Sequence, residues 1–176
     1  MNGIIAKAIQ NGNMEMAKKH TAWFKEVFGD NFYMELQPHN PAELNHQMLE
    51  LADKMGIKST VTLDCHYASP EDRIAEEIML ILGTHPNIRK EAKFEDSRKI
   101  KDLIERLDYL YGDRFMSFKD LDIFLMGHKD VKDLMIDQGI DRDDLYENSV
   151  EISEKIGSYD FKENLDCFLA ISMLPF

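Results

Sequence analysis

Ser59-Thr60-Val61-Thr62-Leu63 is a short β-branched run, and it is typical of a buried parallel strand. An earlier aromatic-rich run at residues 32–36 lies between Gly29-Asp30-Asn31 and Pro38, and it predicts another short strand. Between the two, residues 41–55 repeat apolar side chains at helical spacing until Gly56. The order strand, helix, strand predicts an α/β fold with parallel strands.

Helices are predicted on both sides of this unit. Apolar spacing indicates one helix at residues 4–9 and a second at residues 14–28, which Asn13 caps and Gly29 ends. Ser69 and Pro70 open a further helix that runs to Gly83. Later features are an apolar stripe at 100–110, a strand at 122–126, and helices at 130–138 and 141–156.

The chain divides into three parts by composition. Residues 1–84 are predicted to form the α/β unit, residues 85–118 a charge-dense helical insertion or linker, and residues 119–176 a mixed segment. The break falls at Thr84-His85-Pro86-Asn87. The apolar tail at residues 165–176 suggests either a continuation or a docked terminal strand.

The bulk composition excludes several classes of protein. With 176 residues, 44% of them hydrophobic, the chain can bury a core. Its formal net charge of -12 disfavours independent binding to nucleic acid, which needs Lys and Arg. Cys65 and Cys167 are its two cysteines and form no CxxC pair, which favours the reducing cytoplasm. Because no apolar run approaches about 20 residues, no membrane association is expected.

Asp64 and His66 are the candidate metal ligands. They lie two residues apart just past the strand at 59–63, so their side chains should point the same way at the mouth of a sheet or barrel. A carboxylate and an imidazole suit Zn²⁺, Mn²⁺ or Fe²⁺, but two ligands do not close a site. The alternative is an Asp that caps the following loop beside a surface His. Cys65, between them, is expected to face the opposite side as a small buried hydrophobe.

His39 and Glu35 are candidate supporting groups for the same site. His39 follows the first predicted strand and is a candidate for an outer group near the metal mouth. A loop histidine in water is the alternative. Glu35 lies within that strand, and its carboxylate could reach the same end of the sheet. The alternative is an ordinary ion pair with a neighbouring lysine.

Three stretches together resemble a known family. Residues 28–39, the run Thr62-Leu63-Asp64-Cys65-His66-Tyr67, and Pro70-Glu71-Asp72 are similar to the later part of the PHP domain of bacterial-type replicative DNA polymerases, the DNA polymerase III alpha subunit. Residues 2–6 are similar to the stretch after a metal-binding cysteine in that family. Residues 123–126, 130–134 and 146–155 look like the segment that leads into the polymerase palm. Residues 89–118 match poorly, as an insertion would.

The resemblance implies a partial, distorted β/α barrel followed by a mostly helical segment. The family's barrel holds up to three metal ions, and Asp64 and His66 match its final D-x-H motif. The family's earlier histidine, glutamate and cysteine ligands have no counterpart here. Leu63 replaces the usual asparagine, and Glu76-Glu77 stand where the family commonly has His-Asp. The chain is therefore expected to hold part of a site for a divalent metal, Zn²⁺, Mn²⁺ or Mg²⁺.

Three functions follow as hypotheses. The first is a segment of a replicative DNA polymerase, whose parent is a nucleotidyltransferase with palm carboxylates beyond Phe176. The isolated chain is then expected to be inactive and to have no catalytic residues of its own. The second is a metal-dependent 3′-5′ exonuclease or phosphoesterase when the barrel is completed. The third is a non-catalytic acidic interaction module.

The expected partners follow from the first of these hypotheses. They are the remaining parts of the polymerase, and DNA is contacted only through the complete enzyme. A homodimer or heterocomplex is expected, because the unpaired strand edge of an open barrel can pair with another chain. Either a split polymerase gene, as in a phage, or deliberate excision explains such a piece, and the sequence leaves both open.

Overall fold

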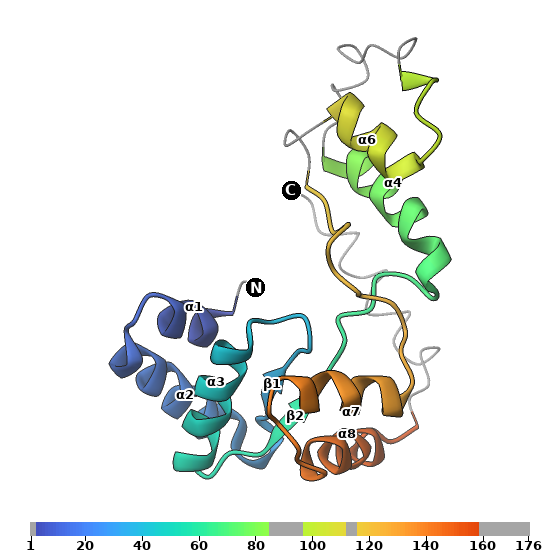
Figure 1. Cartoon of the computed structure of the whole chain (residues 1–176). Helices are drawn as coiled ribbons and strands as arrows, with labels where there is room; N and C mark the ends of the chain where they lie inside the picture. The colour runs from blue at the N-terminus through green and yellow to red at the C-terminus, as the bar shows by residue number, and fades with distance from the viewer. Residues whose placement is uncertain (1–2, 85–96, 112–115, 159–176) are drawn as a thin grey trace, which may run out of the picture.

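Two short parallel strands, β1 (Met34–Leu36) and β2 (Ser59–Val61), lie at the centre of the fold (Figure 1). The computed structural model describes residues 3–84, 97–111 and 116–158. Met34 pairs with Ser59 and Leu36 with Val61, so the strands run side by side in register. Every residue of β2 is buried, whereas β1 alternates between buried and exposed positions. The prediction of a mixed α/β fold with two parallel strands is confirmed, although each strand is two residues shorter than predicted.

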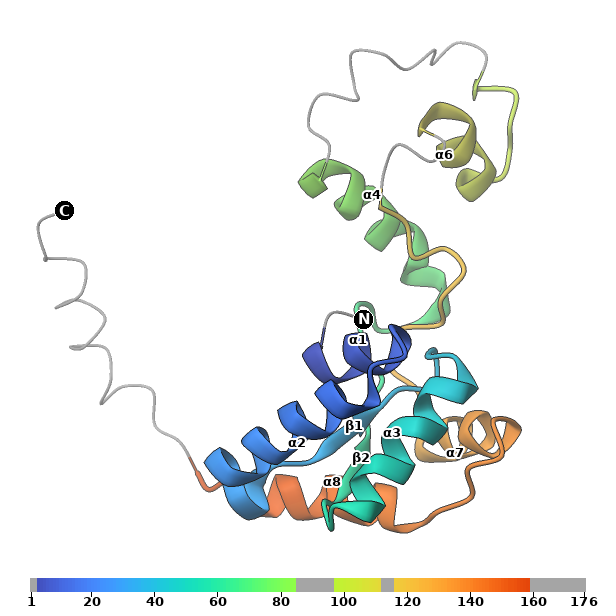
Figure 2. The ribbon, with the colours of Figure 1, turned by 90° about the vertical axis from the view of Figure 1, so that its left-hand side faces the viewer.

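Helices make up most of the described residues. The first group surrounds the sheet and consists of α1 (Ile4–Gln10), α2 (Met14–Phe28), α3 (Ala42–Lys54), α7 (His128–Asp137) and α8 (Asp144–Lys155). The second group consists of α4 (Arg73–Thr84) and α6 (Leu103–Tyr111), which lie away from the sheet (Figure 2). Short 3₁₀ turns at Gly29–Asn31 and Pro70–Asp72 follow α2 and precede α4.

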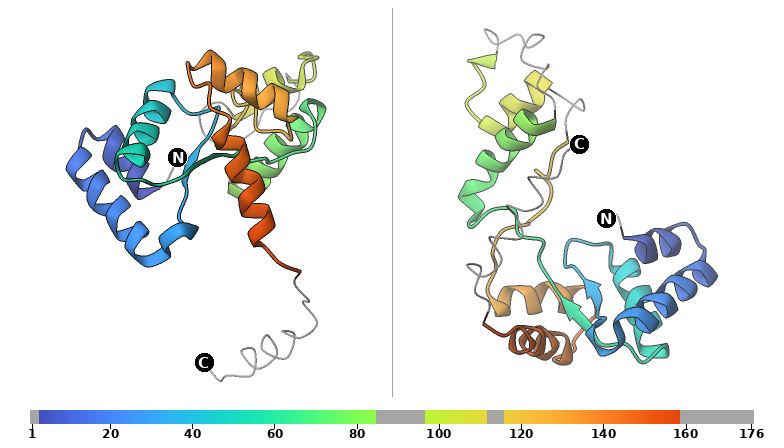
Figure 3. Two further views of the ribbon diagram at one scale, coloured as in Figure 1. Left: turned by 90° about the horizontal axis from the view of Figure 1, so that it is seen from below. Right: turned by 180° about the vertical axis from the view of Figure 1, so that it is seen from behind.

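The core lies on both sides of the sheet. Seen from below in Figure 3, α1, α2 and α3 cover one side of the strands, and α7 and α8 lie on the other. Leu36 of β1, Ala52 of α3, Met135 of α7 and Leu145 of α8 are completely buried and belong to one core cluster. Burial of this kind supplies most of the driving force for folding. The two strands and the helices around them therefore form one packed unit.

Two helix ends that were predicted from single residues, Asn13 and Gly56, are confirmed. The side chain of Asn13 accepts a hydrogen bond from the backbone N–H of Met16, 3.0 Å away. Gly56 has a φ of 61°, the left-handed conformation in which glycine has no steric penalty. Ser69 and Asp72 form a capping box, but the turn that they cap is a 3₁₀ turn, so α4 itself begins at Arg73.

A network of buried amide side chains ties the loop after β1 to two helices. The side-chain amide of Asn45 donates to the carbonyl oxygen of Gln37 at 2.9 Å and to Gln138 Oε1 at 2.7 Å. Gln138 Nε2 donates to the carbonyl oxygen of Pro38 at 2.6 Å, and Asn40 Nδ2 donates to Asn45 Oδ1 at 3.1 Å. Because Gln138 is the C-cap of α7, the network joins α3, α7 and the loop that carries His39.

Replacing Asn45 with alanine is expected to lower the free energy of unfolding by about 1–3 kcal/mol, because buried groups lose their hydrogen-bond partners. Asn45 is fully buried, so water does not reach these groups in its place. Urea denaturation followed by circular dichroism measures the change. The matched control is Gln47→Ala, two residues along α3 in a partly exposed position, which should change stability by less than about 0.5 kcal/mol. Equal effects of both substitutions would contradict the role given to this network.

Two extended segments pair with each other: residues 62–69, which lead from β2 to the turn before α4, and residues 116–127, which precede α7. The N–H of His66 donates to the carbonyl oxygen of Ile123 at 2.8 Å, and that of Leu125 donates to the carbonyl oxygen of Tyr67 at 3.2 Å. The prediction of a strand at residues 122–126 is wrong. In place of a strand, Phe124 forms a single isolated parallel bridge with Tyr67. The reason lies in the facing segment, which is interrupted by Asp64, with a φ of 51°, and ends at the cap of the 3₁₀ turn.

Some predictions fall outside the described residues. These are the structure of the apolar tail at residues 165–176 and the parts of the insertion at residues 85–96 and 112–115. Within the parts of the chain that the structure describes, none of the helices is both long and apolar enough to span a bilayer.

Candidate metal-binding site

The carboxyl ends of β1 and β2 meet at one edge of the sheet, because the strands are parallel neighbours. Glu35 lies within β1, and His39 lies in the loop that follows it. Asp64 and His66 lie in the irregular segment that follows β2. The ends of neighbouring parallel strands are where α/β proteins commonly place binding residues.

Asp64 and His66 lie close to each other at this edge. Asp64 Oδ1 is 3.8 Å from His66 Nε2, so the sequence-based expectation that the two side chains point the same way agrees with the structure. Asp64 has a φ of 51°, a left-handed conformation that few residues other than glycine, asparagine and aspartate adopt. This backbone conformation makes the chain turn immediately after β2 and leaves the carboxylate exposed.

His66 is held by three different contacts. Its Nδ1 is 2.7 Å from Glu76 Oε1 on α4, and its backbone N–H donates to Ile123. The ring of Phe118 stands edge-on to the imidazole, with 4.9 Å between the ring centroids. The imidazole is therefore fixed, and its Nε2 is the nitrogen that faces Asp64.

Glu35 and His39 come to the same edge from β1. Glu35 Oε1 accepts a hydrogen bond from Thr62 Oγ1 at 2.5 Å, so its carboxylate bridges the ends of the two strands. Burial lowers the pKa of His39, and the nearby carboxylate of Asp64 partly opposes this effect. A lowered pKa favours the neutral imidazole, which is the form that binds metals.

An open cavity of about 780 Å³ lies beside these residues. Glu35, His39 and Asp64 line it together with Phe118 and the amino-terminal turn of α1. The cavity thus combines two carboxylates and an imidazole from the loops and strand ends that the sequence singled out.

Two residues of α4 that sequence reasoning did not assign to the site support it. Glu76 contacts His66 directly. Glu77 is almost fully buried, and its carboxylate accepts hydrogen bonds from Ser117 Oγ at 2.7 Å and from the N–H of Phe118 at 2.8 Å. The sequence did carry a signal, because Glu77 falls on the apolar stripe of Ile74 and Ile81. An acidic residue on such a buried stripe indicates that its carboxylate has a polar partner.

The residues fit a divalent metal ion in part. Metal–ligand bonds of about 2.0–2.2 Å to a carboxylate oxygen and an imidazole nitrogen can span the 3.8 Å between Asp64 and His66. Catalytic zinc sites use three protein ligands, however, and the described residues contain no group of three or more His, Cys, Asp or Glu side chains placed to hold a metal ion. The donor chemistry therefore suits an incomplete site with two direct ligands.

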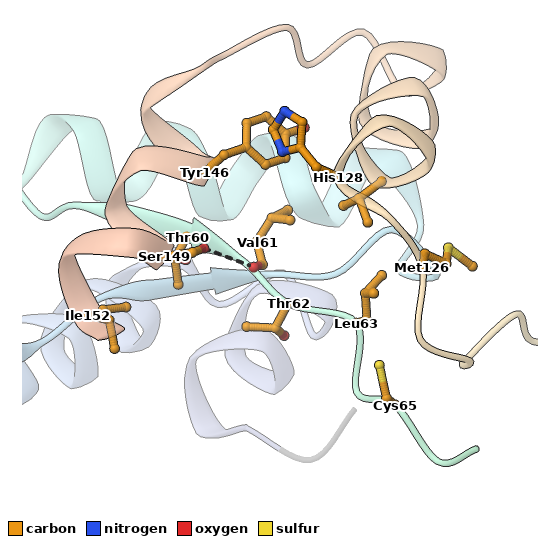
Figure 4. A pocket seen from close by; sticks show the side chains of 11 residues that line it. Thr60, Val61, Thr62, Leu63, Cys65, Met126, His128, Tyr146, Ser149 and Ile152 are labelled. Carbon is orange, nitrogen blue, oxygen red and sulfur yellow. Dashed lines mark hydrogen bonds between the residues drawn. The ribbon is translucent and has the colours of Figure 1, made fainter. Parts of the chain in front are cut away.

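A second cavity, of about 410 Å³, lies between β2, α7 and α8 (Figure 4). Its wall is mainly apolar and contains no carboxylate, and a hydrogen bond of 2.7 Å joins Thr60 to Ser149 across it. Cys65 lines this cavity while Asp64 lines the first, so the two residues face different sides as predicted. The prediction that Cys65 is buried is wrong: its thiol is exposed, because the chain after β2 leaves the packed core.

Comparison with known proteins relates part of this chain to one kind of polymerase subunit. The DNA polymerase III subunit alpha of Borreliella burgdorferi is 33% identical over 104 residues, which cover 57% of this chain and 8% of that protein. The same subunit of Aquifex aeolicus is 38% identical over 79 residues, covering 42% of this chain and 7% of that protein. The subunit of Deinococcus radiodurans is 30% identical over 107 residues. No family model matches the chain.

About half of the chain is thus related in sequence to a segment of the DNA polymerase III alpha subunit. The chain spans less than a tenth of the length of these relatives. The relationship agrees with the resemblance to the DNA polymerase III alpha subunit that the motifs indicated.

Proposed function

We propose that this chain is a segment of a replicative DNA polymerase related to the DNA polymerase III alpha subunit, and that it takes part in DNA replication as part of that enzyme. The sequence relationship to several such subunits supports the proposal. Nucleotide transfer belongs, in this proposal, to the whole polymerase and not to this chain.

Within this role, the α/β part is a PHP-like unit that binds a divalent metal ion incompletely. The observation that carries this proposal is the approach of Asp64 and His66 at the end of β2, with 3.8 Å between Oδ1 and Nε2. Asp64 would supply a carboxylate oxygen and His66 an imidazole nitrogen, with His39 and Glu35 beside them. When bound, a divalent ion at such a site neutralises phosphate charge and makes a bound water more acidic.

The free edge of the sheet supports the idea of an incomplete barrel. β1 pairs only with β2 among the described strands, so its other edge has no strand partner in that part of the chain. The cavity of about 780 Å³ that Asp64 and His39 line lies along β1, with Tyr33, Met34 and Glu35 in its wall. An additional strand from another part of the polymerase would satisfy the backbone groups of this edge.

A surface of exposed apolar side chains also supports a role inside a larger assembly. Trp23, Val27 and Phe28 on α2 are each about half exposed, with exposed fractions of 53%, 51% and 50%. The ring of Phe24 contacts both Trp23, with centroids 5.0 Å apart, and Phe28, with centroids 6.1 Å apart, so these aromatic side chains form a patch. Exposed apolar patches commonly mark protein contacts.

Copurification tests the assembly. We expect the chain to copurify with the preceding and following parts of the same polymerase when all three are coexpressed, and the Trp23→Ser/Phe28→Ser double variant to copurify less. The control Met79→Ser/Ile78→Ser removes exposed apolar side chains from α4 instead. A chain that stays alone or self-associates in sedimentation experiments would contradict the proposal.

A second candidate function is a metal-dependent 3′-5′ exonuclease or phosphoesterase of the completed barrel, which the carboxylates and imidazole of the cavity favour. The isolated chain is expected to be inactive, because two ligands do not hold a metal ion securely for catalysis. EDTA-sensitive degradation of a primer by the purified chain would show that this expectation is wrong.

A further inference from the structure

We propose that Glu76 is a positioning residue that fixes the imidazole of His66 with its proton on Nδ1 and its Nε2 directed towards Asp64. The inference rests on the proposed metal-binding function, and it assigns a role to a residue that stands where the resembled family commonly has histidine.

The contact between Glu76 and His66 determines where the imidazole proton lies. The distance of 2.7 Å between Oε1 and Nδ1 is that of a strong hydrogen bond. An ionised carboxylate only accepts hydrogen bonds, so Nδ1 must donate. In a neutral imidazole Nε2 then carries the lone pair, and Nε2 is the atom 3.8 Å from Asp64 Oδ1.

The environment of Glu76 keeps this contact in place. The Glu76 side chain is 16% exposed and that of His66 is 32% exposed, so water competes weakly for the hydrogen bond. The next residue, Glu77, binds the N–H of Phe118, and the ring of Phe118 packs edge-on against the imidazole. Two consecutive glutamates of α4 thus hold His66, one directly and one through Phe118.

The start of α4 is itself attached to the segments around His66. Arg73 forms an ion pair with Asp122, and its Nη1 donates to the carbonyl oxygen of Lys119 at 3.3 Å. Its Nε donates to the hydroxyl of Tyr67, also at 3.3 Å. Tyr67 follows His66, and Asp122 precedes Ile123, the backbone partner of His66. These contacts therefore attach the start of α4 to both segments that surround the histidine. Glu76 is therefore placed to orient a metal ligand, as outer carboxylates do in many metal sites.

Nuclear magnetic resonance of the imidazole nitrogens in the metal-free full chain tests the inference. We expect His66 to carry a proton on Nδ1, hydrogen-bonded to Glu76. Glu76→Gln should shift it towards the Nε2-protonated tautomer, because a glutamine amide can donate to Nδ1, and Glu76→Ala should leave a mixture. Glu26→Gln, the same change at an exposed position of α2, should leave the His66 signals unchanged.

Calorimetric titration with Zn²⁺ provides the second readout, with an expected loss of affinity of about 10- to 100-fold for Glu76→Gln. A His66 without a proton on Nδ1 in the unaltered chain, or one whose tautomer is the same in Glu76→Gln, would overturn the inference. The expected tautomer in a chain that binds no Zn²⁺ would instead support the positioning role and count against the proposed metal site. Thermal melting checks that each variant is folded.

Discussion

Replacing Asp64 with asparagine is expected to weaken the binding of Zn²⁺ or Mn²⁺ by more than about 100-fold. This loss exceeds the roughly 10- to 100-fold that is typical when a residue that only orients a metal ligand is replaced. The substitution removes the charged oxygen that faces His66 Nε2 while it keeps nearly the same shape. Isothermal titration calorimetry on the metal-free chain measures the change. The control is Asp137→Asn at the exposed end of α7, for which the affinity should be unchanged.

Asparagine is the informative replacement because of the backbone at this position. With a φ of 51°, Asp64 has a conformation that asparagine adopts readily and alanine does not. Asp64→Ala would therefore combine loss of the ligand with a backbone cost of about 1 kcal/mol. An Asp64→Asn variant that binds metal as tightly as the unaltered chain would remove Asp64 from the site.

Replacing Leu36 with alanine is expected to lower the free energy of unfolding by about 2–5 kcal/mol, since it leaves a cavity in a fully buried position. Leu36 is the last residue of β1, and its carbonyl oxygen accepts a hydrogen bond from the N–H of Thr62. The packing of Leu36 therefore supports the strand ends on which the candidate site stands. Chemical denaturation followed by circular dichroism measures the loss.

Leu125→Ala is the control for this prediction. Leu125 is 68% exposed in the segment that leads to α7, so its truncation should change stability by less than about 0.5 kcal/mol. A loss for Leu36→Ala as small as that for Leu125→Ala would mean that β1 is not part of the packed core.

Local sequence patterns predicted the centre of the fold. The β-branched run at residues 59–63 and the aromatic run at 32–36 each indicated a strand, and the helix between them made a parallel arrangement the simplest choice. Placement of Asp64 and His66 on one side followed from their spacing after a strand. These predictions depend on short-range periodicity, which a single sequence shows directly.

The supporting contacts could not be predicted in the same way, because they join residues far apart in the chain. Asn45 and Gln138 meet across 93 positions, and Glu77 binds the N–H of Phe118 across 41. A polar residue on an apolar helical stripe, as at Asn45 and Glu77, indicates that a partner exists without identifying it. The strand predicted at 122–126 failed for a related reason, since the length of a strand depends on the segment beside it.

In our proposal, Asp64 and His66 together bind one divalent metal ion. A Zn²⁺ titration of the isotopically labelled chain, followed by nuclear magnetic resonance of its histidine imidazoles and backbone amides, tests this claim most directly. We expect the imidazole of His66 and the amide of Asp64 to respond first and together, followed by His39, and all of them before His20 of α2 and His46 of α3. A first response at His20 or His46, with His66 unchanged at saturating Zn²⁺, would contradict it.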